Sequence, residues 1–126
     1  MEQQNEEGLS LVNVVLPSGI LEFFTITNIV QSAELLSIYL NEKNISPEEY
    51  VNDKLSSKGF YEEIKVRDFP IRGKEVYLYI KRRRWLNEST GNIVMRNWEV
   101  VAKGTRMTKD FAAFLKVISG YQTGKL

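Results

Sequence analysis

The sequence contains no cysteine and no histidine among its 126 residues. Structural zinc sites are built mainly from thiolates and imidazoles, so a zinc site is not expected. Disulfide frameworks, cysteine nucleophiles, histidine general bases and Ser-His triads are excluded for the same reason. Carboxylates, Lys, Tyr and Ser remain, and none has a spacing that indicates a reaction. We therefore expect a chain that is not an enzyme and that uses neither a metal nor another cofactor.

Long hydrophobic runs are also missing, so no segment is expected to cross a bilayer. The N-terminus lacks the basic segment and following apolar segment of a secretory signal, which predicts a cytoplasmic protein without membrane contact. A glycine-rich phosphate loop is absent as well. Gly73-Lys74-Glu75 has neither the earlier glycine nor the following Ser or Thr of such a loop, and nucleotide hydrolysis has no support.

What is present has the composition of an ordinary globular domain. Hydrophobic residues make up 43% and charged residues 26% of the chain, close to the averages for soluble proteins. We predict one domain over residues 16–119. An acidic N-terminus (1–15) and a polar tail (120–126) have little to bury and are expected to be flexible.

The charges are segregated along the chain, although the overall net charge is only +1. Residues 1–64 hold eleven acidic and three basic side chains, a net charge of −8. Residues 65–109 hold twelve basic and four acidic side chains, a net charge of +8. Such asymmetry indicates a polyanionic partner. The alternative is that the two halves neutralise each other across the folded surface.

The first half of the chain predicts a short helical turn and a hairpin. Residues 20–24 have the spacing of one amphipathic turn, and residues 26–30 and 35–40 predict two strands around a polar turn. Ser46 followed by Pro47 predicts a short helix start. Residues 63–69 alternate like a strand, and residues 68–74 contain the Pro and Gly of a turn.

The second half predicts another hairpin and a helix. Residues 76–85 alternate as one strand, with Val76, Leu78 and Ile80 on one face and Tyr77, Tyr79, Lys81, Arg83 and Trp85 on the other. A turn covers residues 87–92, and residues 93–101 return as its partner. Phe111, Phe114, Leu115 and Ile118 recur at helical spacing after Thr108, a suitable N-cap. The fold class expected is α+β, a small antiparallel sheet of two β-hairpins covered by a C-terminal helix.

Four consecutive cations and a tryptophan end the predicted strand at residues 81–85. Arg and Lys side chains neutralise backbone phosphates, so this basic hairpin is a candidate for phosphate contacts. A merely solvated face is the alternative. Tyr77, Tyr79, Trp85 and Trp98 suit either base stacking or cross-strand packing. The candidate nucleic-acid-binding residues are Lys74, Lys81, Arg82, Arg83, Arg84, Trp85, Arg96, Lys103 and Arg106.

Residues 67–74, the strand and arginine run at 76–85 and the segment 98–115 together resemble the N-terminal region of insertion-sequence transposases of the DDE type. Weaker similarity reaches back to residues 16–21. The resemblance covers most of the chain. It implies a mobile-element protein that binds DNA at transposon ends, with a helix-turn-helix and a catalytic DDE domain following in relatives.

In the zinc-finger-bearing relatives, paired cysteines that bind zinc follow the arginine run. Leu86, Asn87 and Glu88 occupy this region here, so zinc binding is not carried over and the hairpin is expected to be held by packing, with Trp85 and Trp98 as candidates. We expect the DDE chemistry on a continuation or a separate polypeptide. The leading hypothesis is non-catalytic DNA binding and end recognition. The alternatives are a protein-interaction module that assembles with a catalytic transposase polypeptide, and a decayed fragment without function.

Overall fold

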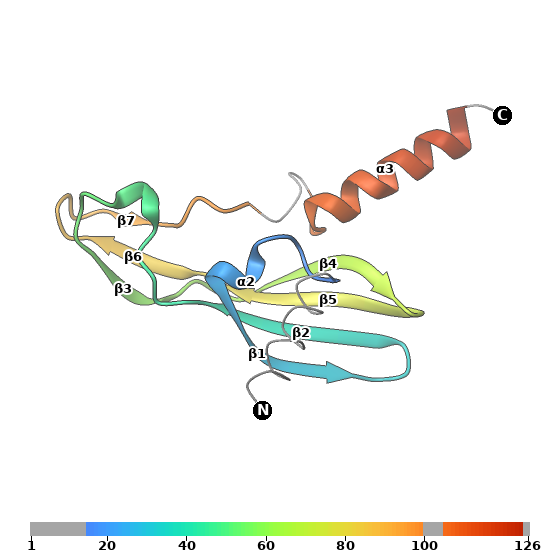
Figure 1. The fold of residues 1–126 in the computed structure, drawn as a ribbon, viewed down its shortest axis with the longest axis horizontal. Helices are drawn as coiled ribbons and strands as arrows, with labels where there is room; N and C mark the ends of the chain where they lie inside the picture. Colours follow the sequence, from blue (N-terminus) through green and yellow to red (C-terminus); the bar gives the residue numbers. More distant parts are fainter. Residues whose placement is uncertain (1–14, 100–104, 125–126) are drawn as a thin grey trace.

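The computed structural model describes residues 15–99 and 105–124, with the side chains of residues 15–99 and 105–119. Two β-sheets lie end to end, and one long helix follows them (Figure 1). The α+β class predicted from the sequence is confirmed. The elements are α2 (Ile20–Phe23), β1 (Phe24–Gln31), β2 (Leu35–Glu42), the 3₁₀ turn η1 (Glu48–Tyr50), β3 (Leu55–Phe60), β4 (Ile64–Ile71), β5 (Lys74–Lys81), β6 (Arg83–Asn87), β7 (Ile93–Val94) and α3 (Lys109–Gly124).

The four-stranded sheet has the order β1-β2-β5-β4 and consists of two hairpins. β1 pairs with β2, as the hairpin predicted over residues 26–40 requires, and β4 pairs with β5, a hairpin that was not predicted; both pairings are antiparallel. The hairpins are joined by parallel pairing of β2 with β5, which sets Ile38 beside Leu78 and Leu40 beside Ile80. β5 is therefore an internal strand, held by hydrogen bonds on both sides.

The main core covers one face of the four-stranded sheet. Val76, Leu78 and Ile80 of β5 are all buried there, as their predicted common face requires. Ile20 of α2 and Phe24 at the start of β1 pack over them, and the Trp98 ring lies 4.9 Å from that of Phe24. The opposite face of the sheet, here called the outer face, carries the alternate residues of the same strands.

The predicted strand over residues 76–85 is wrong as a single element. β5 ends at Lys81, and β6 begins at Arg83 in the second sheet, which has the order β3-β6-β7. The change of partner has a local cause: β2 ends at Glu42, and the carboxylate of Glu42 accepts the backbone N–H of Arg83 at 3.0 Å. Beyond this residue the chain pairs with β3.

The return strand is also shorter than predicted. β7 covers only Ile93–Val94, although the hairpin with β6 is present. The next residues leave the sheet because their side chains have partners elsewhere: Arg96 is buried and Trp98 packs on the main core. Residues 100–101 of the predicted strand lie outside the described residues.

The predicted turn at residues 68–74 is limited to Arg72 and Gly73. Both residues have positive φ, 51° and 79°, which suits the tight two-residue connection of a twisted hairpin. Arg72 is the only described residue other than glycine in that conformation. β4 therefore continues through Pro70 to Ile71, with a register shift after Asp68.

α3 begins where predicted but runs further. The hydroxyl of Thr108 accepts the N–H of Phe111 at 3.3 Å, which confirms the predicted cap, and it donates to Asp68 at 2.8 Å. Phe111 packs against Phe69 of β4, with ring centroids 5.2 Å apart. The helix then extends away from the sheet to Gly124, past the domain end predicted at residue 119 (Figure 1).

The short turn at residues 20–24 is present as α2, and the helix start after Ser46 is the single 3₁₀ turn η1. The predicted flexible segment 1–15 lies, except for Val15, outside the described residues. No helix within residues 15–99 and 105–124 is long and apolar enough to cross a membrane.

Asp68 should make stability depend on pH. Burial raises the pKa of this carboxyl, and the hydrogen bond from Thr108 opposes the shift only in part. Because the folded state holds its proton more tightly, the favourable contribution is full below the unfolded pKa and is lost as pH rises through the folded pKa. The variant Asp68→Asn keeps an oxygen that can accept the hydrogen bond from Thr108. We expect its free energy of unfolding to increase relative to that of wild type as pH rises from the unfolded to the folded pKa of Asp68.

Urea unfolding of both proteins at a series of pH values measures the difference, with the exposed Glu62→Gln as a matched control. A difference between Asp68→Asn and wild type that stays constant with pH, or moves in favour of wild type as pH rises, would contradict this prediction.

Candidate nucleic-acid interface

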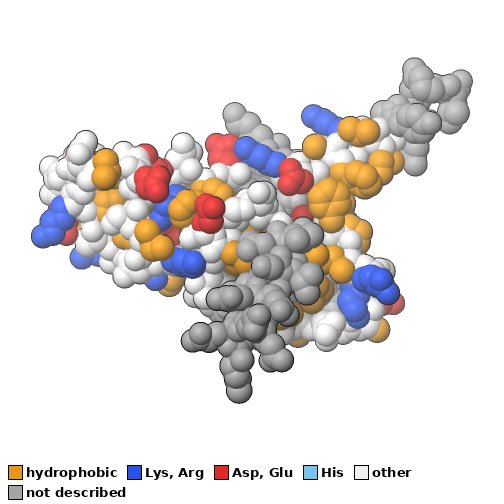
Figure 2. Space-filling view, viewed as in Figure 1, with side chains coloured by type: hydrophobic (Ala, Val, Ile, Leu, Met, Phe, Trp, Pro, Cys, Tyr) orange, Lys and Arg blue, Asp and Glu red, His pale blue; other side chains and the backbone are white. Residues whose placement is uncertain are grey.

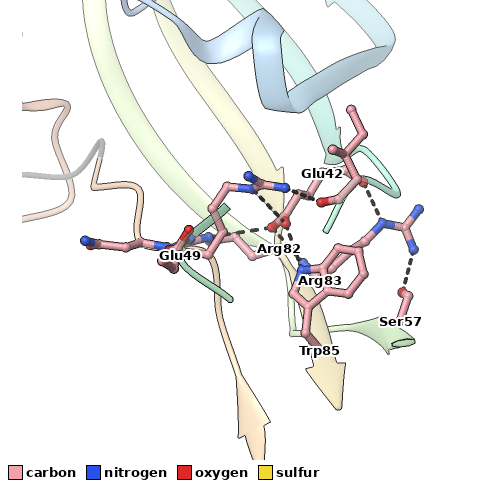
Figure 3. A network of polar contacts seen from close by, with 9 residues as sticks. Glu42, Glu49, Ser57, Arg82, Arg83 and Trp85 are labelled. Atoms are coloured by element: carbon pink, nitrogen blue, oxygen red, sulfur yellow. Dashed lines mark hydrogen bonds and ion pairs between the residues drawn. The ribbon is translucent and has the colours of Figure 1, made fainter. Parts of the chain in front are cut away.

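A buried carboxylate, Glu42, organises the region where the basic run was expected to face solvent. Glu42 is only 1% exposed. Its carboxylate accepts three hydrogen bonds, from the backbone N–H of Arg83 at 3.0 Å, the indole N–H of Trp85 at 3.1 Å and Nε of Arg96 at 3.3 Å (Figure 3). A buried charge is tolerated only when paired and hydrogen-bonded, and these donors meet that requirement.

Arg96 is the closest cation to Glu42. The residue is 4% exposed, and its guanidinium also donates to the backbone carbonyl of Ile45 and lies 4.3 Å from the centre of the Phe23 ring. All of these partners belong to the acidic half of the chain. Arg96 is therefore a structural cation, and its predicted role as a flanking phosphate contact is corrected because its donors are directed into the protein.

Arg82 lies on the other side of the same carboxylate. Its Nε lies 4.0 Å from Oε1 of Glu42, which makes an ion pair. This Nε forms no hydrogen bond with any described residue, whereas Nη2 donates to the backbone carbonyl of Arg96. Its side chain is 18% exposed. Burial lowers the pKa of the Arg82 guanidinium, and the charge of Glu42 partly restores it. The predicted phosphate contact at Arg82 is thus replaced by an internal ion pair.

Arg83 and Trp85 complete the network. Nε of Arg83 donates to the carbonyl of Glu42 at 2.9 Å, and its Nη1 donates to the hydroxyl of Ser57 at 2.8 Å. Trp85 is 1% exposed, so its ring cannot stack on a base in this conformation. Packing through Trp85 was the expected support of the hairpin, and the structure adds the hydrogen bond to Glu42.

The remaining predicted residues are dispersed. Lys74 donates to the carbonyls of Ser32 and Ala33, which closes the β1–β2 turn. Arg84 is exposed over the Tyr61 ring, with 5.7 Å between guanidinium and ring centre. Lys103 lies outside the described residues. The structure thus does not bring the eight predicted residues that it describes together on one surface. In the view of Figure 2, cationic side chains are interspersed with carboxylates.

A different group of cations and aromatic rings lies on the outer face of the four-stranded sheet. Tyr39 of β2 and Tyr79 of β5 are register partners whose rings stack at 4.6 Å with 12° between planes. The ammonium of Lys65 of β4 lies 4.3 Å from the ring centre of Tyr77 and 5.9 Å from that of Tyr79. Tyr77 and Tyr79 were predicted from the sequence to share a face with cations.

An open groove of about 340 Å³ borders the ring of Tyr77. It forms because residues 106–108 pair with the edge of β4: Arg67 N–H donates to the carbonyl of Arg106 at 2.8 Å, and Thr108 N–H donates to the carbonyl of Arg67 at 2.9 Å. This pairing brings a segment from far along the chain beside β4. The residues lining the groove are Lys65, Arg67, Tyr77, Arg106 and Met107.

The outer face carries more positive than negative charge. Lys65, Arg67, Lys81 and Arg106 lie on it or beside the groove, and Lys65 and Arg106 are exposed. Glu75 pairs with Arg67 at 3.4 Å and offsets part of this charge. The exposed carboxylates Glu62 and Glu63 precede β4 and mark where the basic surface ends. We call this surface, with its tyrosines, the tyrosine–cation face.

Sequence reasoning missed Lys65, Arg67 and Tyr39 as members of this surface. The alternation of side chains along each strand could have identified them. Lys65 and Arg67 flank the buried Val66 in β4, and Tyr39 lies between the buried Ile38 and Leu40 in β2. The parallel pairing of β2 with β5, which places Tyr39 against Tyr79, has no such signal. Within residues 15–99 and 105–124, no three carboxylates gather into a group that could hold a metal.

Comparison of the chain with protein-family models, curated proteins and solved structures gave no match.

We expect the loss of the Glu42 charge to be strongly destabilising. Glu42→Gln leaves the buried guanidiniums of Arg82 and Arg96 without their counter-charge, and breaking a buried ion pair in this way costs about 3–5 kcal/mol. Chemical denaturation measures the change in the free energy of unfolding.

The control is Glu48→Gln, the same substitution at an exposed position on η1. That change should stay within about 0.5 kcal/mol of wild type. Equal stability of Glu42→Gln and Glu48→Gln would show that the network is not a stabilising element.

Proposed function

We propose that this chain is a non-catalytic DNA-binding region of a transposase, which recognises transposon ends and holds DNA phosphates on its tyrosine–cation face. The observation that carries the proposal is the clustering of Lys65, Arg67 and Arg106 around one groove, with Lys81 on the same face. The strand-transfer chemistry would belong to a separate catalytic polypeptide or domain, and the complex would act in the cytoplasm.

The location of these cations supports phosphate contacts better than the basic run does. Lys65 and Arg106 are exposed, whereas Arg82 and Arg83 have their donors directed at Glu42, Ser57 or backbone carbonyls. A guanidinium already committed to protein acceptors would have to break those contacts before it met a phosphate. Exposed cations require no such exchange, and each one that neutralises a phosphate releases a counterion.

The internal position of Arg82 and Arg83 also fits the resemblance. In zinc-bearing relatives the hairpin after this run is held by a metal, and here Glu42 connects Arg83, Trp85 and Arg96 across two sheets. Arg82 and Arg83 would then serve the folded scaffold, and the contacts to DNA would lie on β4, β5 and the segment before α3.

Removing the two exposed cations should weaken DNA binding in a salt-dependent manner. We expect Lys65→Gln with Arg106→Gln to reduce the slope of log affinity against log salt by about 0.9 for each phosphate of duplex DNA that the variant no longer neutralises. Fluorescence anisotropy with a terminal-repeat duplex, titrated from about 50 mM to about 200 mM salt, measures the slope.

The matched control is Lys54→Gln with Lys58→Gln, which removes the same charge around β3 in the other sheet. Its slope should equal that of wild type. An equal reduction in both double variants would indicate a non-specific charge effect, and an unchanged slope in Lys65→Gln with Arg106→Gln would remove this face from the interface.

A second candidate function is assembly with a catalytic transposase polypeptide through α3. The Phe114 ring still contacts that of Phe69 of β4, with centroids 5.4 Å apart, but Phe114 is 47% exposed, and Val117 further along α3 is 70% exposed. Figure 2 shows apolar side chains along this helix. Exposed apolar positions on a projecting helix are typical of helix-mediated docking.

Co-expression with a DDE-domain polypeptide tests the docking. We expect Val117→Glu to abolish co-purification in nuclease-treated extract without changing the melting temperature, because the side chain is mostly exposed. Lys116→Glu, an exposed charge change on the same helix, is the control. Loss of co-purification in both variants, or in neither, would argue against an apolar contact at Val117.

A further inference from the structure

The groove on the tyrosine–cation face combines one aromatic ring with cations. Tyr77 and Met107 supply apolar surface, and Lys65, Arg67 and Arg106 surround it. A nucleotide also combines an apolar part with a charged part, because its base has flat apolar faces and its phosphate carries the negative charge. The groove is thus suited to a base and its phosphate together, and an inorganic anion would leave the apolar wall unused.

The tyrosine rings are already used as flat surfaces within the protein. Tyr39 and Tyr79 stack on each other nearly in parallel, and the Lys65 ammonium lies over the ring of Tyr77. Lys65 is exposed and can move from the ring to a phosphate. The exchange is favourable because a stacked base gains more from an aromatic ring than an exposed cation does.

A base paired within a duplex cannot make this contact. It presents only its edge in the grooves, and its flat surfaces are covered by neighbouring bases. The outer strands of a four-stranded sheet are about 14 Å apart, wider than the major groove of about 12 Å. A broad sheet face with half-exposed rings therefore favours strands whose bases are unpaired.

We propose that the tyrosine–cation face binds unpaired DNA, with one base stacked on Tyr77 in the groove and the adjacent phosphates on Lys65 and Arg106. This inference rests on the proposed DNA-binding function and specifies its substrate as an opened or single strand. Arg67 also lines the groove, and its ion pair with Glu75 offsets part of its charge.

Anisotropy titrations with a labelled single strand, its duplex and an abasic strand of equal length test the inference. The abasic strand keeps every phosphate and lacks the bases. We expect the single strand to bind at least about tenfold more tightly than the other two at equal salt, and Tyr77→Leu to weaken single-strand binding about 5- to 150-fold. Tyr77→Phe, which keeps the ring, should bind like wild type.

Melting temperatures of both Tyr77 variants establish that they fold. Duplex binding as tight as single-strand binding, or single-strand affinity unchanged by Tyr77→Leu, would overturn the inference while leaving the DNA-binding function in place. Failure of the wild-type chain to bind any of the three DNAs would overturn both.

Discussion

The fold depends on one buried carboxylate. Glu42 ends β2 in the four-stranded sheet, and its side chain and backbone hold Arg83 and Trp85 at the start of β6 in the other sheet. It also fixes Arg96 on the segment after β7. Three parts of the chain that are far apart in sequence thus meet at two carboxylate oxygens. Isolated burial of this charge would be very costly, so its donors must be in place whenever the two sheets are joined.

This interaction changes the meaning of the charge segregation. The acidic and basic halves neutralise each other where Glu42 meets Arg82 and Arg96, which was the alternative to a polyanionic partner. The neutralisation is local, however. Lys65 and Arg106 remain exposed on the outer face, where Glu75 offsets only Arg67. The strongest sequence signal for DNA therefore belongs to the scaffold, and a weaker one, spread over three segments, forms the better candidate surface.

The sequence predicted those features that depend on a single element. Alternation at Val76, Leu78 and Ile80 identified the buried face of β5, and Thr108 was identified as the cap of α3. Features that depend on partners were missed. The apolar series of Val76, Leu78 and Ile80 ends before Arg82, but the run of cations that follows does not indicate a new strand partner, because the cause of the change lies at Glu42, forty residues earlier.

The same limit applies to the candidate surface. Alternation along a strand predicts which of its residues share a face, but it does not predict which strands are neighbours in the sheet. Tyr39 meets Tyr79 only through the parallel β2–β5 pairing, and Arg106 reaches the groove only because residues 106–108 pair with β4. Both contacts are long-range, so neither leaves a periodic pattern in the sequence.

The Glu42 network and the tyrosine–cation face are connected through β5. This strand carries Tyr77, Tyr79 and Lys81 on its outer side, and its last residue immediately precedes Arg82. Substitution of Arg82 would disturb the end of β5 and displace the outer-face residues without directly removing a phosphate contact. Weaker DNA binding by an arginine-run variant therefore identifies a contact only if its stability is unchanged, whereas Lys65 and Arg106 lie away from the network and report on the surface itself.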